Sequence, residues 1–219
     1  ILLAQNGATV PESAAEAFIN SEKGIETAQK ALAGAMDIIA ERISDDAAVR
    51  KWVRETTYRT GRLVTKAKKE EDSVYRLYYD YSEPLSRIPS HRALAVNRGE
   101  KEGFLSVGVE ADKERITEWI TARFVKKQPA ECGKYVAAAA ADAYERLIAP
   151  SVKTEMRNTV TAAAQEQAIS VFGENLRNLL MLPPVRGKVV MGFDPAYRTG
   201  CKIAVVNDVG DVLDTAVVY

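Results

Sequence analysis

The residue in this sequence that is best placed for chemistry is an aspartate at the end of a short apolar run. Residues 189–194 read Val-Val-Met-Gly-Phe-Asp and are bounded by glycine and proline, which predicts a buried strand with Asp194 at its functional tip. The loop that follows carries two cations, Arg198 and Lys202, and two more apolar runs complete a predicted hairpin. This pattern indicates either a carboxylate that binds a catalytic metal or a loop that holds phosphate.

Both chemistries need more than this segment supplies. In ribonuclease H-like nucleases and resolvases the aspartate binds metal, and in actin-like and sugar-kinase-like ATPases the loop and hairpin hold phosphate. Two-metal chemistry requires several carboxylates that hold ions about 3.5–4 Å apart. We interpret Asp208 and Asp211 as turn residues around Gly210, and Asp214 as an outward-facing strand residue. We therefore expect no catalytic residue beyond the vestigial candidate Asp194, no metal site and no cofactor.

Composition excludes several classes of protein. Thirty basic residues balance thirty acidic ones among 219 residues, so no global basic field marks a dedicated nucleic-acid binder. Two cysteines 69 positions apart and a single histidine argue against a zinc site or a disulfide framework. No apolar run is long enough to span a membrane. These features indicate a cytoplasmic protein with no membrane partner, and the absent initiator Met makes us expect an internal piece of a longer chain.

Apolar spacing predicts two helices in the first quarter of the sequence. Apolar residues recur at alternating steps of three and four over residues 25–43, which is typical of one amphipathic helix. Ser44 is then expected to cap a second helix, with Asp45 and Asp46 in its first turn. Gly61 is expected to end that helix.

The middle of the sequence predicts a mixture of strands and helices. Residues 62–68 and 104–109 are expected to be short strands, and the tyrosine-rich residues 73–81 are expected to be helical up to the break at Pro84. Asp112 is expected to cap a further helix.

Two more helical stretches are marked by their stop signals. Residues 90–99 are expected to form a short helix with Ser90 as its cap and Gly99 as its C-terminal stop. The alanine-rich stretch from residue 130 to about residue 182 is expected to be helical and to be divided by Pro150.

A local basic window invites a nucleic-acid interpretation. Eight basic residues against the single Glu55 give residues 48–69 a local charge of +7, with Trp52 and Tyr58 interleaved. Basic side chains that neutralise phosphates beside aromatic rings are a known nucleic-acid footprint. Trp52 also lies on an apolar stripe, which favours a core position, and acidic residues 70–72 follow directly and weaken the field.

Four residues in the 90–99 stretch have competing interpretations. Ser90 and His91 are adjacent, so their side chains point in different directions and do not form a nucleophile and base pair. His91 is expected to be a packed or hydrogen-bonded imidazole. Arg92 and Arg98 lie near two glutamates, so structural pairing and nucleic-acid contact both remain open.

Several motifs, in order, resemble the bacterial Tex family of transcription accessory proteins. The resemblance runs from residue 22 to residue 219. Its motifs are Gly-Phe-Asp-Pro-Ala-Tyr-Arg-Thr-Gly-Cys-Lys at residues 192–202 and, upstream, residues 22–24, 31–35, 37–42, 80–84 and 88–100. One departure is Ala196, where the family pattern has glycine, and this makes close approach of a phosphate to the backbone less favourable.

The resemblance implies a mainly α fold with a small α/β part. Residues 1–186 would form the helical Tex-type central region with a small strand-containing insert, and residues 187–219 the first three strands of a truncated YqgF-type ribonuclease H-like domain. Such domains are generally regarded as non-catalytic in this family. The resemblance further implies a cytoplasmic protein that binds RNA or DNA and works with the transcription machinery.

We therefore expect a non-enzymatic scaffold with nucleic-acid binding, weak in this chain because the family's OB-fold RNA-binding domain lies elsewhere. The alternatives are a metal-dependent nuclease in the full-length protein and a purely protein-interacting module. The open sheet edge at residues 212–218 is expected to be covered either by another chain, through self-association, or by disorder. The residues expected to contact nucleic acid are Arg50, Lys51, Arg54, Arg59, Arg62, Lys66, Arg92, Arg98, Arg198 and Lys202.

Overall fold

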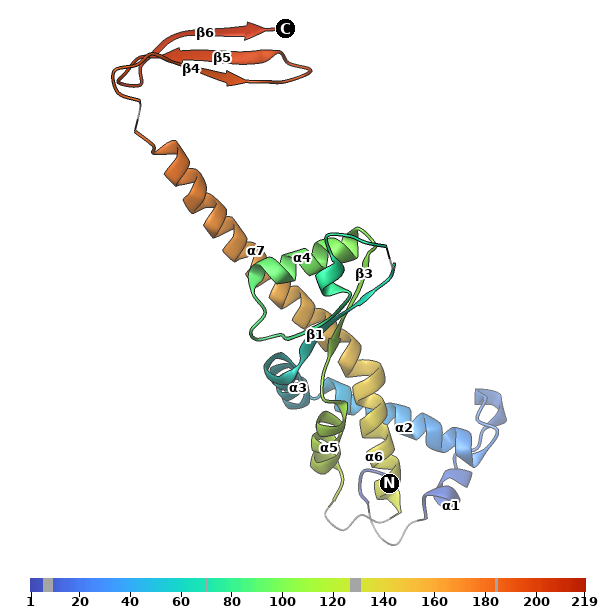
Figure 1. Ribbon diagram of the computed structural model, residues 1–219. Helices are drawn as coiled ribbons and strands as arrows, with labels where there is room; N and C mark the ends of the chain where they lie inside the picture. Colours follow the sequence, from blue (N-terminus) through green and yellow to red (C-terminus); the bar gives the residue numbers. More distant parts are fainter. Residues whose placement is uncertain (6–9, 70, 127–130, 184) are drawn as a thin grey trace. The chain divides into compact units, whose positions relative to one another are not determined.

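The computed structural model describes residues 1–5, 10–69, 71–126, 131–183 and 185–219 and contains two compact units. Unit 1 spans Ile1–Ala168 and unit 2 spans Ile169–Tyr219 (Figure 1). A helical region followed by a small antiparallel sheet confirms the expected fold class. The division expected between residues 186 and 187 stays a prediction, and Glu70, Ala130 and Pro184 lie outside the described residues.

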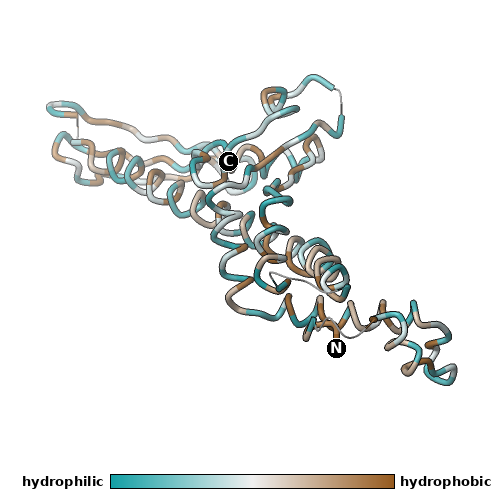
Figure 2. Tube along the Cα trace, turned by 90° about the horizontal axis from the view of Figure 1, so that it is seen from below, coloured by the Kyte–Doolittle hydropathy of each residue, from teal (hydrophilic) through white to brown (hydrophobic). Residues whose placement is uncertain are grey.

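Unit 1 begins with α-helices that bury part of their apolar surface and with a short 3₁₀ turn that buries none of its residues. They are α1 (Pro11–Glu16), the 3₁₀ turn η1 (Ser21–Lys23), α2 (Ala28–Asp45) and α3 (Ala47–Thr60). In α2 the buried stripe contains Leu32, Ile39 and Ile43, as the spacing predicted. Figure 2 shows polar and apolar residues alternating along the helices, which is the pattern of a helix that covers a core on one side.

The cap between α2 and α3 differs from the expected one. The expected cap, Ser44, is buried at the end of α2 and donates its hydroxyl hydrogen bond to the carbonyl of Glu41. Asp46 is the cap instead, because its Oδ1 accepts from the N–H groups of Ala48 and Val49 at 2.8 and 3.0 Å. The predicted end at Gly61 is confirmed.

A three-stranded antiparallel sheet follows α3. Its strands are β1 (Arg62–Ala67), β2 (Asp80–Pro84) and β3 (Leu105–Glu110), in the order β2-β1-β3. The prediction of a helix over residues 73–81 is wrong, since that stretch holds only the 3₁₀ turn η2 (Arg76–Tyr78) before β2 begins. Pairing with β1 offers residues 80–84 a full ladder of backbone hydrogen bonds, and the Thr65 hydroxyl fixes the turn by donating to the carbonyl of Tyr78.

Along the chain, α4 (Ser90–Lys101) lies between β2 and β3, and α5 (Lys113–Phe124) follows β3. The Asp112 cap of α5 is confirmed. The two signals expected for α4 are wrong: Ser90 donates to Gln167 rather than capping the helix, and Gly99 lies buried inside it. A Cβ at Gly99 would lie 2.7 Å from Leu105 Cδ1, so the glycine serves close packing. The helix ends before Gly103, which has a φ of 80°.

One long helical stretch completes unit 1 and continues into unit 2. It consists of α6 (Cys132–Asp142), the π-helical segment η3 (Ala143–Ile148) and α7 (Ala149–Leu180). Pro150 does not divide it, contrary to expectation. The N–H of Ala149 bonds to the carbonyl of Tyr144, five residues back, and this wider turn accommodates the proline ring and its missing donor.

Aromatic stacking joins α3 to α5 at the edge of the core. The rings of Trp52 and Trp119 are parallel within 3° and their centroids are 4.0 Å apart. Both rings are partly buried against the main hydrophobic cluster, as the apolar-stripe interpretation of Trp52 predicted. Tyr58, in contrast, is exposed.

Unit 2 contains the predicted strands as an antiparallel sheet of order β4-β5-β6. Its strands are β4 (Val190–Asp194), β5 (Cys201–Val206) and β6 (Val212–Val218). The turn between β5 and β6 is organised by Asn207, whose Oδ1 accepts from the N–H groups of Val209 and Asp211, and Gly210 takes a φ of 94°. No helix among the described residues is long and apolar enough to cross a membrane.

Candidate nucleic-acid interface

Three residues of the basic window are held by contacts within unit 1. Arg50 donates from Nε to the carbonyl of Ser44 at 2.5 Å and from Nη1 to Ser151. Arg54 Nε lies 2.7 Å from Glu155 Oε1, an ion pair in which the N–H is not directed at the carboxylate as in a hydrogen bond. Lys51 Nζ lies 3.9 Å from Glu55 in the same helix. Arg50 and Arg54 thus join α3 to α7.

Two more of the predicted contact residues bind strand β2. Arg62 donates to the hydroxyl and carbonyl of Ser82 at 2.7 and 2.9 Å. Arg92 Nη1 lies 3.2 Å from Glu83 Oε1, so the pairing interpretation of Arg92 holds, although the partner is a different glutamate from the two expected. Both arginines therefore support the sheet.

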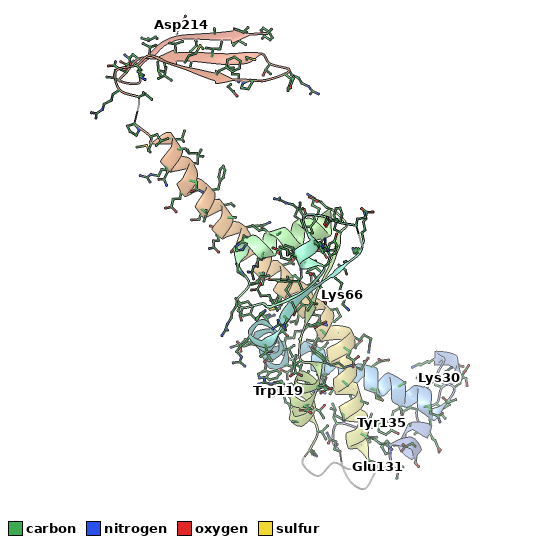
Figure 3. All side chains as sticks on the ribbon, viewed as in Figure 1. Lys30, Lys66, Trp119, Glu131, Tyr135 and Asp214 are labelled. Atoms are coloured by element: carbon green, nitrogen blue, oxygen red, sulfur yellow. The ribbon has the colours of Figure 1, made fainter. Side chains whose placement is uncertain are left out.

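The side chains of the remaining predicted cations of unit 1 have no hydrogen bond or ion pair with any other described residue. They are Arg59, Lys66 and Arg98, and all three are exposed. Lys66, which is labelled in Figure 3, lies on β1. In the sheet it is opposite Asp80 on one side and Ser106 on the other. These three side chains are the ones available to a partner.

Lys66 belongs to a cluster of which only some members lie in the basic window of residues 48–69. The end of β1 meets the start of β3, where the N–H of Lys68 donates to the carbonyl of Phe104 at 2.8 Å. Lys69 Nζ lies 5.1 Å from the centre of the Phe104 ring. The last residue of α4, Lys101, precedes this ring by three positions. We name Lys66, Lys68, Lys69, Lys101 and Phe104 the sheet-tip cluster.

A buried tyrosine, Tyr75, packs against the aromatic ring of the sheet-tip cluster. The Tyr75 ring packs on Phe104 with centroids 5.7 Å apart, and its hydroxyl donates to Glu102 Oε2 at 2.8 Å. Burial raises the pKa of Tyr75, Glu102 raises it further, and the nearby charge of Arg98 opposes both effects. Arg98 therefore lies at the border of the cluster. Sequence reasoning missed Lys101 and Phe104, because strand pairing brings them to the end of the basic window.

Unit 2 presents the other predicted residues in a different setting. Asp194 is directly opposite Lys202 in the β4–β5 ladder, so the two side chains share one face of the sheet. They border a hollow of about 590 Å³ that Gly192, Ala204 and Thr215 also line. In the described part of the chain no group of three or more His, Cys, Asp or Glu residues is placed to hold a metal. Arg198 lies in the exposed loop between β4 and β5.

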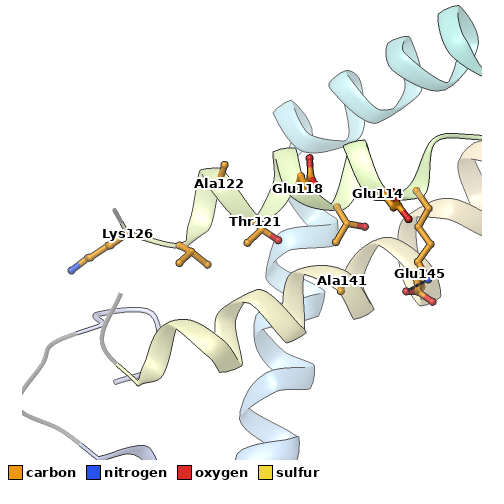
Figure 4. A pocket seen from close by; sticks show the side chains of 10 residues that line it. Glu114, Glu118, Thr121, Ala122, Lys126, Ala141 and Glu145 are labelled. Atoms are coloured by element: carbon orange, nitrogen blue, oxygen red, sulfur yellow. Dashed lines mark ion pairs between the residues drawn. The ribbon is translucent and has the colours of Figure 1, made fainter. Parts of the chain in front are cut away.

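A larger cleft of about 810 Å³ lies between α5 and the stretch formed by α6 and η3 (Figure 4). Lys113 spans it at one end through an ion pair of 2.6 Å with Glu145. The residues that line it are Lys113, Glu114, Thr117, Glu118, Thr121, Ala122, Val125, Lys126, Ala141 and Glu145. None of the residues predicted to bind nucleic acid lies there.

Comparison with known proteins places these elements in a family. The family model described as "Tex central region-like" matches residues 6–172. The family model described as "Tex protein YqgF-like domain" matches residues 188–219. The protein "Transcriptional accessory protein Tex" of Neisseria gonorrhoeae is 35% identical over 229 residues, which cover 100% of this chain and 30% of that protein.

Other relatives agree in extent. "Uncharacterized protein YdcI" of Bacillus subtilis (strain 168) is 42% identical over 209 residues, 94% of this chain and 29% of that protein. "S1 RNA-binding domain-containing protein 1" of Pongo abelii is 32% identical over 212 residues, 90% of this chain and 21% of that protein. The chain thus spans less than a third of the length of these relatives. Because the central-region match covers more than half of its residues, the chain belongs to the Tex family.

Proposed function

We propose that this chain is a non-enzymatic part of a cytoplasmic Tex-type transcription accessory factor, and that it contacts RNA or DNA through the sheet-tip cluster. The observation that carries the proposal is a group of lysines without ion-pair partners among the described residues, which lie near Phe104 in the sheet or along the chain, with Lys69 Nζ 5.1 Å from the ring centre. The names of two relatives, one a transcriptional accessory protein and one an S1 RNA-binding domain-containing protein, support a role close to nucleic acid.

The chemistry of the sheet-tip cluster suits a single strand. Lysine ammonium groups neutralise phosphates at variable geometry, and an aromatic face stacks on any base, which gives binding without sequence preference. Phe104 is only partly exposed and its ring already packs against Lys69 and Tyr75, so it offers an edge or part of one face. Acidic residues such as Asp80 and Glu102 border the lysines. We therefore expect weak and strongly salt-dependent binding by this part of the protein.

A charge-reversal experiment tests the interface. The double variant Lys68→Glu and Lys69→Glu is expected to abolish binding of a fluorescent single-stranded RNA at low salt, measured by anisotropy. The matched control reverses the same number of charges at Lys23, which is exposed in η1, and at Lys153, which is partly exposed in α7. Equal loss in both variants would show that only net charge matters and would overturn the assignment to the sheet tip.

The non-enzymatic part of the proposal is supported by the Asp194–Lys202 pairing. Lys202 is opposite Asp194 in the β4–β5 ladder, and a cationic residue beside the candidate carboxylate makes binding of a divalent cation there less favourable. The rival function is a metal-dependent nuclease in the full-length protein. Cleavage of RNA or DNA by that protein with Mg²⁺ or Mn²⁺, abolished by Asp194→Asn, would establish the nuclease. No cleavage, or cleavage that survives the substitution, would exclude Asp194 as a catalytic ligand.

The partners that we propose besides nucleic acid are components of the transcription machinery and a second copy of the chain through strand β6. A purely protein-interacting module is the other alternative. It predicts no change in the anisotropy of RNA or DNA at any salt concentration, whereas the proposed function predicts binding at low salt that weakens as salt is added.

A further inference from the structure

One side of α4 faces solvent and carries three basic side chains. His91, Arg98 and Lys101 are exposed, and Leu94 between them is partly exposed. Their spacing of three, four and three residues places all four on one side of the helix. We name them the α4 stripe. The helix buries a different side, which includes Val96, and the stripe ends at Lys101, so it runs into the sheet-tip cluster.

The expectation of a packed or hydrogen-bonded imidazole at His91 is wrong for the part of the chain that the structure describes. The side chain is exposed and has no hydrogen bond or ion pair with any other described residue. An imidazole without an intramolecular partner offers an aromatic face on which an unpaired base can stack. His91 therefore offers the same type of contact as Phe104, at the other end of the α4 stripe.

The acidic residues beside the α4 stripe leave its positive charge largely intact. Glu100 is paired with Arg157 of α7, whose Nη2 donates to Glu100 Oε2 at 2.8 Å. Glu102 remains as one carboxylate, and its Oε2 accepts from the hydroxyl of Tyr75 at 2.8 Å. Neither the arginine nor the lysine of the stripe has an ion pair among the described residues. The stripe thus has a net positive charge, which complements a phosphate backbone.

The length of the helix sets how much nucleic acid is needed to cover the α4 stripe. His91 and Lys101 are ten residues apart in the sequence. At a rise of 1.5 Å per residue, that separation is about 15 Å along the helix axis. Stacked bases follow one another every ~3.4 Å along one strand. A stacked strand of about five nucleotides therefore spans the stripe.

We propose that a single strand of RNA or DNA continues from the sheet-tip cluster along the α4 stripe, with Arg98 on its phosphates and the His91 ring stacked on one of its bases. Leu94 lies between the two and offers an apolar contact to a ribose or a base edge. A single strand is the fitting ligand, because the bases of a duplex are already stacked and paired. This inference rests on the proposed function and extends its contact surface to residues outside the basic window.

Substitution of His91 tests the stacking contact. His91→Ala is expected to weaken binding of a fluorescent single-stranded RNA of about 12 nucleotides at least about fivefold, as for loss of one base–aromatic stack. His91→Tyr keeps an aromatic face and is expected to bind within about twofold of the wild type. Because the side chain is exposed, both variants should keep the wild-type Tm. No loss for His91→Ala, or an equal loss for His91→Tyr, would overturn the stacking contact.

The salt dependence of binding tests the phosphate contact. Each neutralised phosphate of a single strand contributes about −0.7 to the slope of log K against log salt concentration. Arg98→Gln is therefore expected to make the slope less steep by about 0.7. Arg115→Gln is the matched control, since it removes an exposed arginine from α5, and it should leave the slope unchanged. The same slope in Arg98→Gln as in the wild type would refute the phosphate contact.

The outcomes separate this inference from the proposed function. Binding that is lost on reversal of Lys68 and Lys69 but is unchanged in the His91 and Arg98 variants would confine the contact to the sheet tip and refute the path along α4. The absence of binding to any single strand at low salt would overturn the proposed function and this inference together.

Discussion

Arg157 is the residue of unit 1 whose removal tests the packing most sharply. It reaches from α7 to α4 and β3, where Nη2 donates to Glu100 Oε2 at 2.8 Å and to Asn97 Oδ1 at 2.9 Å. Its Nη1 donates to the carbonyl of Val107 and to Glu100 Oε1, both at the longer distance of 3.3 Å. Arg157→Gln would leave one carboxylate, one amide oxygen and one carbonyl without their cation.

The size of the effect follows from how far the pair is shielded from water. The side chains of Arg157 and Glu100 are 20% and 36% exposed. The pair therefore lies between a buried ion pair, whose breakage costs about 3–5 kcal/mol, and a surface pair, worth about 0.2–1 kcal/mol. We expect Arg157→Gln to cost about 2 kcal/mol. For a chain of this length that corresponds to a fall in Tm of about 4–8 °C.

A double-mutant cycle isolates the pair. Arg157→Gln, Glu100→Gln and the double variant are compared by urea denaturation of the whole chain, followed by far-ultraviolet circular dichroism. Because the double variant leaves no unpaired charge, it is expected to be more stable than the sum of the single losses predicts, with a coupling energy of about 1–2 kcal/mol. A coupling energy indistinguishable from zero would refute the idea that Arg157 and Glu100 stabilise unit 1 as a pair.

Three further predictions concern single sites in unit 1. The hydrogen bond from the Tyr135 hydroxyl is the main cause of the lowered pKa of Glu12, so this carboxylate stabilises the fold above the ordinary pKa of a carboxyl group and stops doing so as the pH falls through the lowered value. Glu12→Gln should therefore lower Tm at neutral pH, and the difference from wild type should close in acid; a difference that stays constant down to about pH 3 would contradict this. Gly99→Ala should lower stability to urea by about 1–3 kcal/mol, because the new methyl group meets Leu105 at 2.7 Å, and an unchanged urea midpoint would show that β3 moves away freely. Asp46→Ala should cost about 1 kcal/mol through loss of the α3 cap, whereas Asp46→Asn should keep most of it, and equal losses in the two variants would point to charge rather than capping.

Local signals in the sequence predicted the elements whose information lies within a few residues. The stripe of α2 and the Asp112 cap of α5 follow from side-chain spacing and from one carboxylate near free N–H groups. Ser44 failed as a cap because Asp46, two residues later, is an equally good acceptor, and sequence spacing does not choose between them. The backbone conformation decides between them: Asp46 has the extended φ and ψ of a cap residue, whereas Ser44 is still inside α2.

The failures elsewhere have non-local causes. Residues 73–81 carry no strand signal of their own, and residues 80–84 extend because β1 offers them a ladder. Gly99 looks like a stop signal in sequence but is a contact point for a side chain of β3. Phe104 and Lys69 are 35 positions apart, so no window of the sequence could have grouped them.

The same non-local contacts decide which of the predicted nucleic-acid-binding residues are available to a partner. Composition showed where the basic residues are concentrated, and it could not show that Arg50 and Arg54 contact α7 or that Arg62 contacts β2. Those partners lie 20 to about 100 positions away along the chain. Separating structural from available cations therefore depends on tertiary contacts.

The π-helical turn before Pro150 has a consequence for how the chain tolerates changes in length. A π turn holds one residue more than an α turn, so it rotates everything beyond it by about 100° about the helix axis. The buried row of α7, which includes Val152, Met156 and Val160, meets unit 1 only in that rotated setting. Deleting a single residue from η3 would restore ideal helical geometry locally while turning this row toward water. The π-helical turn thus sets the rotation of α7 about its own axis. A fully regular α-helix would point the buried row of α7 away from the core of unit 1.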